Sequence, residues 1–109
     1  MAITKICIFQ LNVEGLTRNK RDLIRHLADE NNANIILLQE THAETEEKLE
    51  IEGFNIIDYI PSKHHGIASY SSEGINANLV QKSPEVSSIQ WNTVEAEGYQ
   101  IVNLYKPPP

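Results

Sequence analysis

The feature that most constrains the fold is a strand–helix–strand pattern at the start of the chain. Residues 3–11 are apolar on both alternating faces, which predicts a strand buried on both sides. An amphipathic helix is predicted over Arg18–Glu30, with Thr17 as its N-cap. Residues 34–39 contain an aliphatic run and predict a second buried strand. Together these segments predict a βαβ unit with parallel strands and a right-handed crossover.

The rest of the chain is rich in short strands. Residues 44–49 predict a short acidic helix and Phe54–Ile60 a strand. Four later segments, separated by Gly, Ser and Pro, predict an antiparallel meander; they are residues 66–71, 76–81, 86–95 and Tyr99–Tyr105. Glu97 and Gly98 predict the tight turn of the last hairpin. The expected fold class is therefore α/β (α+β), with a βαβ unit followed by a mostly antiparallel β meander.

Length and composition limit the possible functions. The chain has 109 residues, enough for one small domain, and a net charge of -6 that disfavours tight DNA binding. The same acidity is compatible with a site for a divalent cation. A single cysteine, Cys7, excludes an intramolecular disulfide, and residues 1–5 lack the layout of a secretory signal. We expect an intracellular protein of the nucleus or cytoplasm, with no membrane segment and no small-molecule cofactor.

Asn12 and Glu40 are candidates for one metal site. Each follows a predicted strand, and their separation matches one βαβ unit. Parallel neighbouring strands end at the same edge of a sheet, where ligands of open α/β sheets bind. Mg²⁺ is typically held by one or two carboxylates, with water and substrate phosphate as the other ligands. Taken singly, an Asn here is more often a turn former, and a Glu more often a solvated residue at a helix start.

Four short motifs occur in the order expected of the endonuclease/exonuclease/phosphatase superfamily. They are QLNVEGL at residues 10–16, IILLQET at 35–41, GIASY at 66–70 and IVNLYKPP at 101–108. The chain most resembles the apurinic-type endonuclease domain of non-LTR retrotransposons. The resemblance covers nearly the whole sequence and implies the N-terminal half of a four-layer α/β sandwich.

The resemblance also implies roles for individual residues. Asn12 corresponds to an Asn that orders the metal site, and Glu40 to the Glu that binds Mg²⁺ or Mn²⁺. Tyr105 corresponds to a Tyr whose hydroxyl lies at the substrate phosphate, although a strand Tyr without this context usually serves packing. The implied activity is metal-dependent cleavage of a phosphodiester, with the DNA backbone as the partner.

The sequence departs from the family pattern in three places. Glu14 stands where the family often has a second Asn, and His65 precedes Gly66 where the family has Gly-Gly. The family continues into a second half with an Asp-x-Asn motif and an Asp-His pair, and no Asp or His follows Tyr105. Residues 1–109 are therefore expected to form a truncated domain that lacks most of its second sheet. As a nuclease it is expected to be weak or inactive.

Three alternatives remain open from the sequence. The chain could be a non-catalytic remnant with at most weak metal or partner binding. It could belong to a phosphatase or RNase branch of the superfamily, because fold alone does not fix the substrate. A zinc site could also be built from Glu40, His42, His64 and His65, although adjacent loop histidines are usually surface residues.

Overall fold

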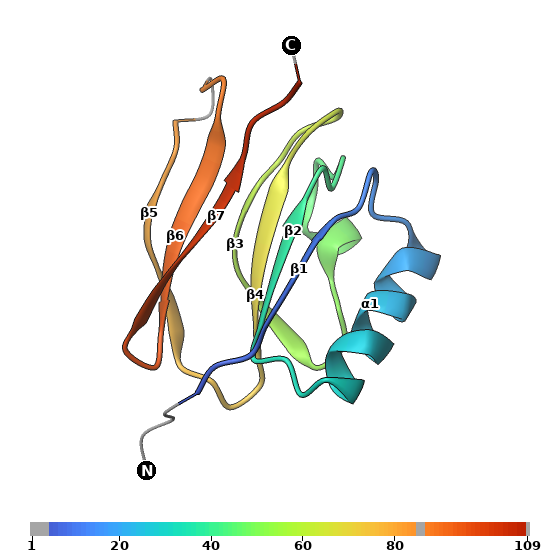
Figure 1. Ribbon diagram of the computed structural model, residues 1–109. Coiled ribbons are helices and arrows are strands. Elements are labelled where there is room, and N and C mark those ends of the chain that lie inside the picture. The colour runs from blue at the N-terminus through green and yellow to red at the C-terminus, as the bar shows by residue number, and fades with distance from the viewer. Residues whose placement is uncertain (1–4, 85–86, 109) are drawn as a thin grey trace.

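The computed structural model describes residues 5–84 and 87–108 and arranges them in three layers (Figure 1). A helix covers one face of a four-stranded sheet, and a three-stranded sheet covers the other. The strands are β1 (Ile8–Asn12), β2 (Ile35–Gln39), β3 (Phe54–Ile60), β4 (Ile67–Ser72), β5 (Ala77–Lys82), β6 (Gln90–Ala96) and β7 (Tyr99–Tyr105), with the helix α1 (Arg18–Glu30) and a 3-10 helix η1 (Glu46–Leu49). This mixed α+β arrangement is compatible with a fragment of an α/β sandwich.

The predicted βαβ unit is confirmed. Strands β1 and β2 pair in parallel, with Asn12 opposite Gln39 at their carboxyl ends. The Thr17 side chain caps α1 by accepting a hydrogen bond from the backbone N–H of Lys20 at 3.2 Å. No helix in the described part of the chain is long and apolar enough to cross a membrane.

The first sheet has the order β1-β2-β4-β3, so β4 lies between β2 and β3 and is antiparallel to both. The prediction that β4 begins the meander is therefore wrong; only β5, β6 and β7 form it. A central position suits β4, because five of its six residues are buried and such a strand needs neighbours on every side. The acidic segment also differs from its prediction, since η1 is a single 3-10 turn.

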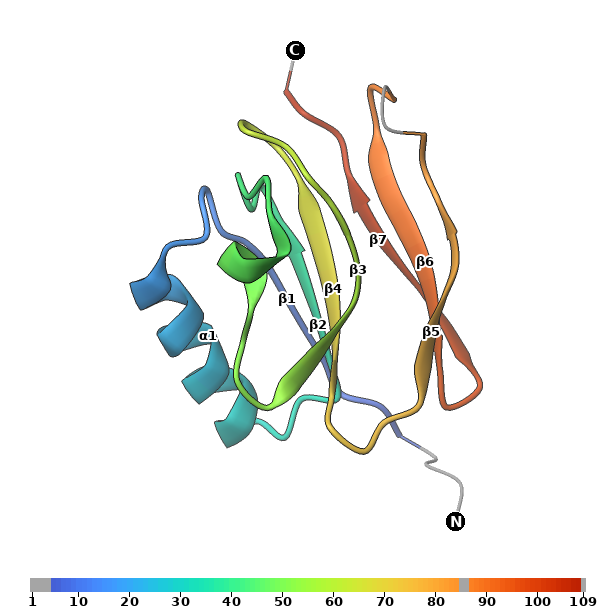
Figure 2. The same cartoon turned by 180° about the vertical axis from the view of Figure 1, so that it is seen from behind.

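The second sheet, β5-β6-β7, packs on the face of the first sheet opposite α1, as the reversed view in Figure 2 also shows. Its last hairpin turns at Glu97 and Gly98, with Ala96 opposite Tyr99, as predicted. Three strands form this sheet among the described residues, and the expectation that most of the family's second sheet is missing stays a prediction. One apolar core lies between the sheets, around Ile35 and Val94, and another under α1.

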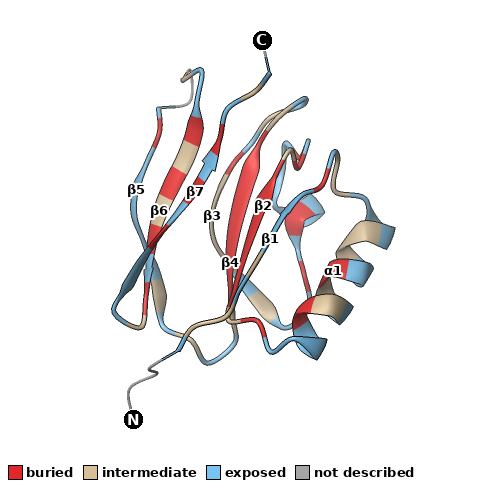
Figure 3. Ribbon diagram, in the orientation of Figure 1, coloured by how far each residue is buried: buried red, intermediate tan, exposed pale blue. Residues whose placement is uncertain are grey.

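Strand β1 differs from its prediction because it is not buried on both faces. It forms an edge of the first sheet (Figure 3). Ile8 is 44% and Leu11 41% exposed. The second sheet packs mainly on β2, β4 and β3, which leaves Ile8 uncovered, whereas Leu11 lies on the α1 face of this edge strand. Residues 3, 4 and 86 of the predicted strands lie outside the described residues.

A row of hydrogen-bonded polar side chains crosses the interface between the two sheets. The Asn103 amide, 1% exposed, donates to the carbonyl oxygens of Ala68 at 3.0 Å and Leu38 at 3.3 Å, and to Ser69 Oγ at 3.1 Å. Its Oδ1 accepts from Gln39 Nε2 at 2.7 Å. These bonds tie β7 to β2 and β4 and fix the register in which the sheets meet.

The free edge of β7 should cause self-association. Within residues 5–84 and 87–108, strand β7 pairs only with β6, and the outward-facing Val102 and Leu104 are 55% and 60% exposed. A long apolar edge strand is a template for pairing with another chain. We expect a concentration-dependent rise in sedimentation coefficient, abolished by the double substitution Val102→Lys and Leu104→Lys. Leu23→Lys, at an equally exposed position on α1, is the matched control and should change nothing. An unmodified chain whose sedimentation coefficient remains that of a monomer at all concentrations would contradict the prediction.

Candidate metal and phosphate site

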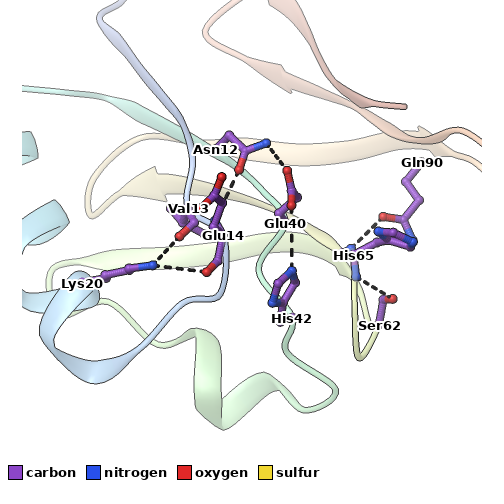
Figure 4. Close-up of polar contacts among 10 residues, drawn as sticks. Asn12, Val13, Glu14, Lys20, Glu40, His42, Ser62, His65 and Gln90 are labelled. Atoms are coloured by element: carbon purple, nitrogen blue, oxygen red, sulfur yellow. Dashed lines mark hydrogen bonds and ion pairs between the residues drawn. The ribbon is translucent and has the colours of Figure 1, made fainter. Parts of the chain in front are cut away.

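Asn12 and Glu40 meet at the carboxyl edge of the parallel pair (Figure 4). Asn12 ends β1, Glu40 follows β2, and Asn12 Nδ2 donates to Glu40 Oε2 at 2.5 Å. Asn12 Oδ1 accepts in turn from the backbone N–H of Glu14 at 3.3 Å. The predicted proximity of the two side chains is thus confirmed, and the nitrogen and the oxygen of the Asn12 side-chain amide each form a hydrogen bond with a neighbouring residue.

The backbone around these residues is held in an unusual conformation. Glu14, Glu40 and His42 have positive φ angles of 46°, 55° and 55°. Non-glycine residues rarely adopt this region, and such strain often accompanies functional sites. Hydrogen bonds hold it in place: the Gly15 N–H donates to the Glu40 carbonyl at 2.7 Å, and the Leu16 N–H donates to the Thr41 carbonyl at 2.8 Å. These backbone hydrogen bonds join the two loops that carry Asn12 and Glu40.

Tyr105 reaches the same corner from the end of β7. It is 8% exposed, and its buried hydroxyl interacts with Glu40. Burial, followed by the negative charge of Glu40, raises the pKa of the Tyr105 hydroxyl above its ordinary value of 10.0. The hydroxyl therefore keeps its proton at neutral pH and can donate a hydrogen bond to an anion. All three residues predicted from the sequence are thus brought together.

Glu40 is the group best placed to hold a cation. Its side chain is 24% exposed, and Oε1 lies 4.0 Å from His42 Nε2. Among residues 5–84 and 87–108, no group of three or more His, Cys, Asp or Glu could hold a metal ion, so the four-donor zinc arrangement is not formed there. A single accessible carboxylate suits Mg²⁺ or Mn²⁺, because Mg²⁺ takes its other ligands from water and substrate phosphate.

Sequence reasoning missed several residues that shape this corner. Gln90 Oε1 accepts from the backbone N–H of Gly66 at 2.8 Å, and Ser62 Oγ accepts from that of His65 at 3.0 Å (Figure 4). The His65 ring lies 6.0 Å from the Tyr105 ring, centroid to centroid. The available signal was the departure from Gly-Gly at His65; nothing in the local sequence marks Gln90, which arrives from the second sheet.

The fold resembles that of a known nuclease. The crystal structure of the AP endonuclease LMAP from Leishmania major superposes with a TM-score of 0.63 and 16% sequence identity. The similarity covers 90% of this chain and 39% of the LMAP chain. Neither the family models nor the curated proteins that were compared with the chain match it. At this identity the likeness shows a shared fold alone, over about two fifths of the LMAP chain.

Proposed function

We propose that the chain carries part of a divalent-metal phosphodiesterase site of the DNA endonuclease type. The observation that supports this most is the Asn12–Glu40 hydrogen bond at the carboxyl edge of the parallel strands, with Tyr105 beside it. Glu40 would hold Mg²⁺ or Mn²⁺, Asn12 would orient Glu40, and the Tyr105 hydroxyl would donate to the phosphate. A metal bound there would polarise the phosphodiester and help to generate the attacking hydroxide.

The resemblance of residues 10–16 and 35–41 to the retrotransposon endonucleases favours DNA as the substrate class. The net charge of -6 weakens nonspecific attraction to the DNA backbone, so binding should be weak without the cation. Among the described residues, no group of three or more His, Cys, Asp or Glu could hold a metal ion, so Glu40 would be the one carboxylate ligand of this site. We therefore propose low or no turnover for the 109-residue chain.

Nicking of supercoiled plasmid tests this function. We expect little or no nicking with Mg²⁺, and any nicking that occurs should disappear with EDTA and in Glu40→Gln. Glu44→Gln, at an exposed position nearby, is the matched control. Nicking that persists in EDTA and in Glu40→Gln would show that Glu40 takes no part in the cleavage. Rapid nicking that depends on Glu40 would instead show that these residues suffice for catalysis.

A second candidate is a non-catalytic member of the same fold. The absence of a complete metal-binding group among the described residues favours it. This candidate predicts that neither Mg²⁺ nor Mn²⁺ binds at Glu40, and that Glu40→Gln changes no measured property beyond a small effect on stability. The Asn12–Glu40 pair would then serve only to join the two loops.

A further inference from the structure

The strands that carry the proposed site are joined by a second set of side-chain hydrogen bonds, one step earlier along the chain. Its central residue is Gln39, which ends β2 just before Glu40 and is 6% exposed. Gln39 Oε1 accepts from Gln10 Nε2 on β1, and Gln39 Nε2 donates to Asn103 Oδ1 on β7 at 2.7 Å. We call Gln10, Gln39 and Asn103 the amide row. It connects β1 to β7 through β2.

The amide row repeats the connections of the site itself. Glu40 also links the two flanking strands, because it accepts from Asn12 on β1 and interacts with Tyr105 on β7. Asn12 lies two residues beyond Gln10, and Tyr105 lies two residues beyond Asn103. Side chains two positions apart on a strand share one face. On both flanking strands, a member of the amide row is therefore the neighbour of a site residue.

The amide row has one possible orientation, which is fixed at Asn103. The Asn103 amide nitrogen donates to the carbonyl oxygens of Leu38 and Ala68, and these oxygens can only accept. The Asn103 oxygen must then face Gln39. Gln39 in turn must direct its nitrogen to Asn103 and its oxygen to Gln10. A buried network with a single satisfied arrangement holds its strands at a defined separation.

We propose that Gln39 is a positioning residue of the site, which sets the separation of Glu40 from Asn12 and from Tyr105 across the two sheets. Gln39 would touch neither the cation nor the substrate, because its side chain is buried and both ends of its amide have protein partners. The proposal rests on the proposed function for its metal readout. The geometry that it concerns can be measured without metal.

Mn²⁺ affinity, followed by electron paramagnetic resonance, is the first readout. Gln39→Met keeps the approximate length of the side chain and removes both hydrogen bonds, so Asn12 and Tyr105 are no longer held beside Glu40. We expect Mn²⁺ to bind about tenfold more weakly, the lower end of the loss found when a residue supporting a metal ligand is replaced. Gln10→Leu removes only the bond to β1 and should cause a smaller loss.

Nuclear magnetic resonance of the metal-free chain is the second readout. The rings of His65 and Tyr105 lie 6.0 Å apart, centroid to centroid, so their protons should give a nuclear Overhauser effect. Gln39→Met should weaken this effect, because β7 loses its bond to β2. Gln10→Leu should leave it unaltered and should instead shift the side-chain amide signals of Asn12. Gln10 is exposed on an edge strand, so this variant tests the row even if Gln39→Met does not fold.

Val94→Ala is the matched control for stability. Val94 is 0% exposed and belongs to the apolar core between the sheets, outside the amide row. The substitution leaves a cavity at the same interface and should lower Tm. It should change neither the Mn²⁺ affinity nor the ring contact. A merely structural role of Gln39 predicts instead that Gln39→Met and Val94→Ala behave alike.

The outcomes separate this proposal from the metal site. Losses of Mn²⁺ affinity and of the ring contact in Gln39→Met, absent from Val94→Ala, support the positioning role. Unchanged Tyr105 signals in Gln39→Met together with unchanged Asn12 signals in Gln10→Leu overturn it, as do equal changes in Gln39→Met and Val94→Ala. If the unmodified chain binds no Mn²⁺, the proposed function fails, and the metal-free signals still decide the role of Gln39.

Discussion

Asn103→Asp is expected to destabilise the chain by about 3–5 kcal/mol, the range found when a buried charge is left without a partner. The substitution keeps the size of the side chain and replaces the amide NH₂ by a carboxylate oxygen. That oxygen would face the carbonyl oxygens of Leu38 and Ala68, which now accept from the amide. A domain of this size has roughly 5–15 kcal/mol of stability in total, so the loss should be large.

Urea denaturation followed by circular dichroism measures the effect. Asn78→Asp, at an exposed position on β5, is the matched control and should change the free energy of unfolding by less than about 0.5 kcal/mol. A loss below about 1 kcal/mol in Asn103→Asp would mean that the amide does not fix the contact between the sheets. Tyr105 lies two residues beyond Asn103 on β7, so the same bonds position its hydroxyl near Glu40.

Gly66→Ala should have the second large effect. We expect it to lower the free energy of unfolding by about 3–4 kcal/mol. Gly66 has a φ of +99°, and an added Cβ would lie 2.7 Å from Thr41 Oγ1 and 3.0 Å from the Ile60 carbonyl oxygen. The backbone oxygen cannot move away cheaply, because Ile60 pairs with β4. The variant would therefore bear two costs, the backbone strain of the positive φ and the steric clash of the added Cβ.

Gly74→Ala separates these two causes. Gly74 has a similar φ of +90°, but an added Cβ would meet nothing within 4 Å. Gly74→Ala should lower the free energy of unfolding by only about 1–2 kcal/mol, because backbone strain is its only cost. The difference in free energy of unfolding between the two variants then measures the crowding at Thr41. Equal losses in Gly66→Ala and Gly74→Ala would show that the corner beside Glu40 has room to spare.

The local patterns of the sequence predicted the elements well because each depends on nearby residues. The Thr17 cap, the helix Arg18–Glu30 and the strand Phe54–Ile60 occur with the predicted bounds. The proximity of Asn12 and Glu40 also followed from sequence, because parallel neighbours bring their carboxyl ends to one edge.

Features that depend on the packing of distant segments could not be predicted in the same way. The apolar pattern of β1 resembles that of a buried strand, yet its burial is decided by where the second sheet lies. Likewise, the apolar and small residues of β4 suit a meander or a central strand equally well. In the sequence, Gln90 and Asn103 are indistinguishable from ordinary polar strand residues. Their amides form hydrogen bonds with Gly66 and Ala68 only because the two sheets pack together.

Binding of Mn²⁺, followed by its electron paramagnetic resonance signal, tests the central claim most directly. The claim is that Glu40, oriented by Asn12, is a ligand of a divalent cation. We predict one saturable site in the unmodified chain and in Glu44→Gln. Glu40→Gln should weaken it by about tenfold or more, since even residues that only support a ligand typically matter that much. Equal binding in Glu40→Gln and the unmodified chain would contradict the claim and leave the Asn12–Glu40 pair a purely structural contact.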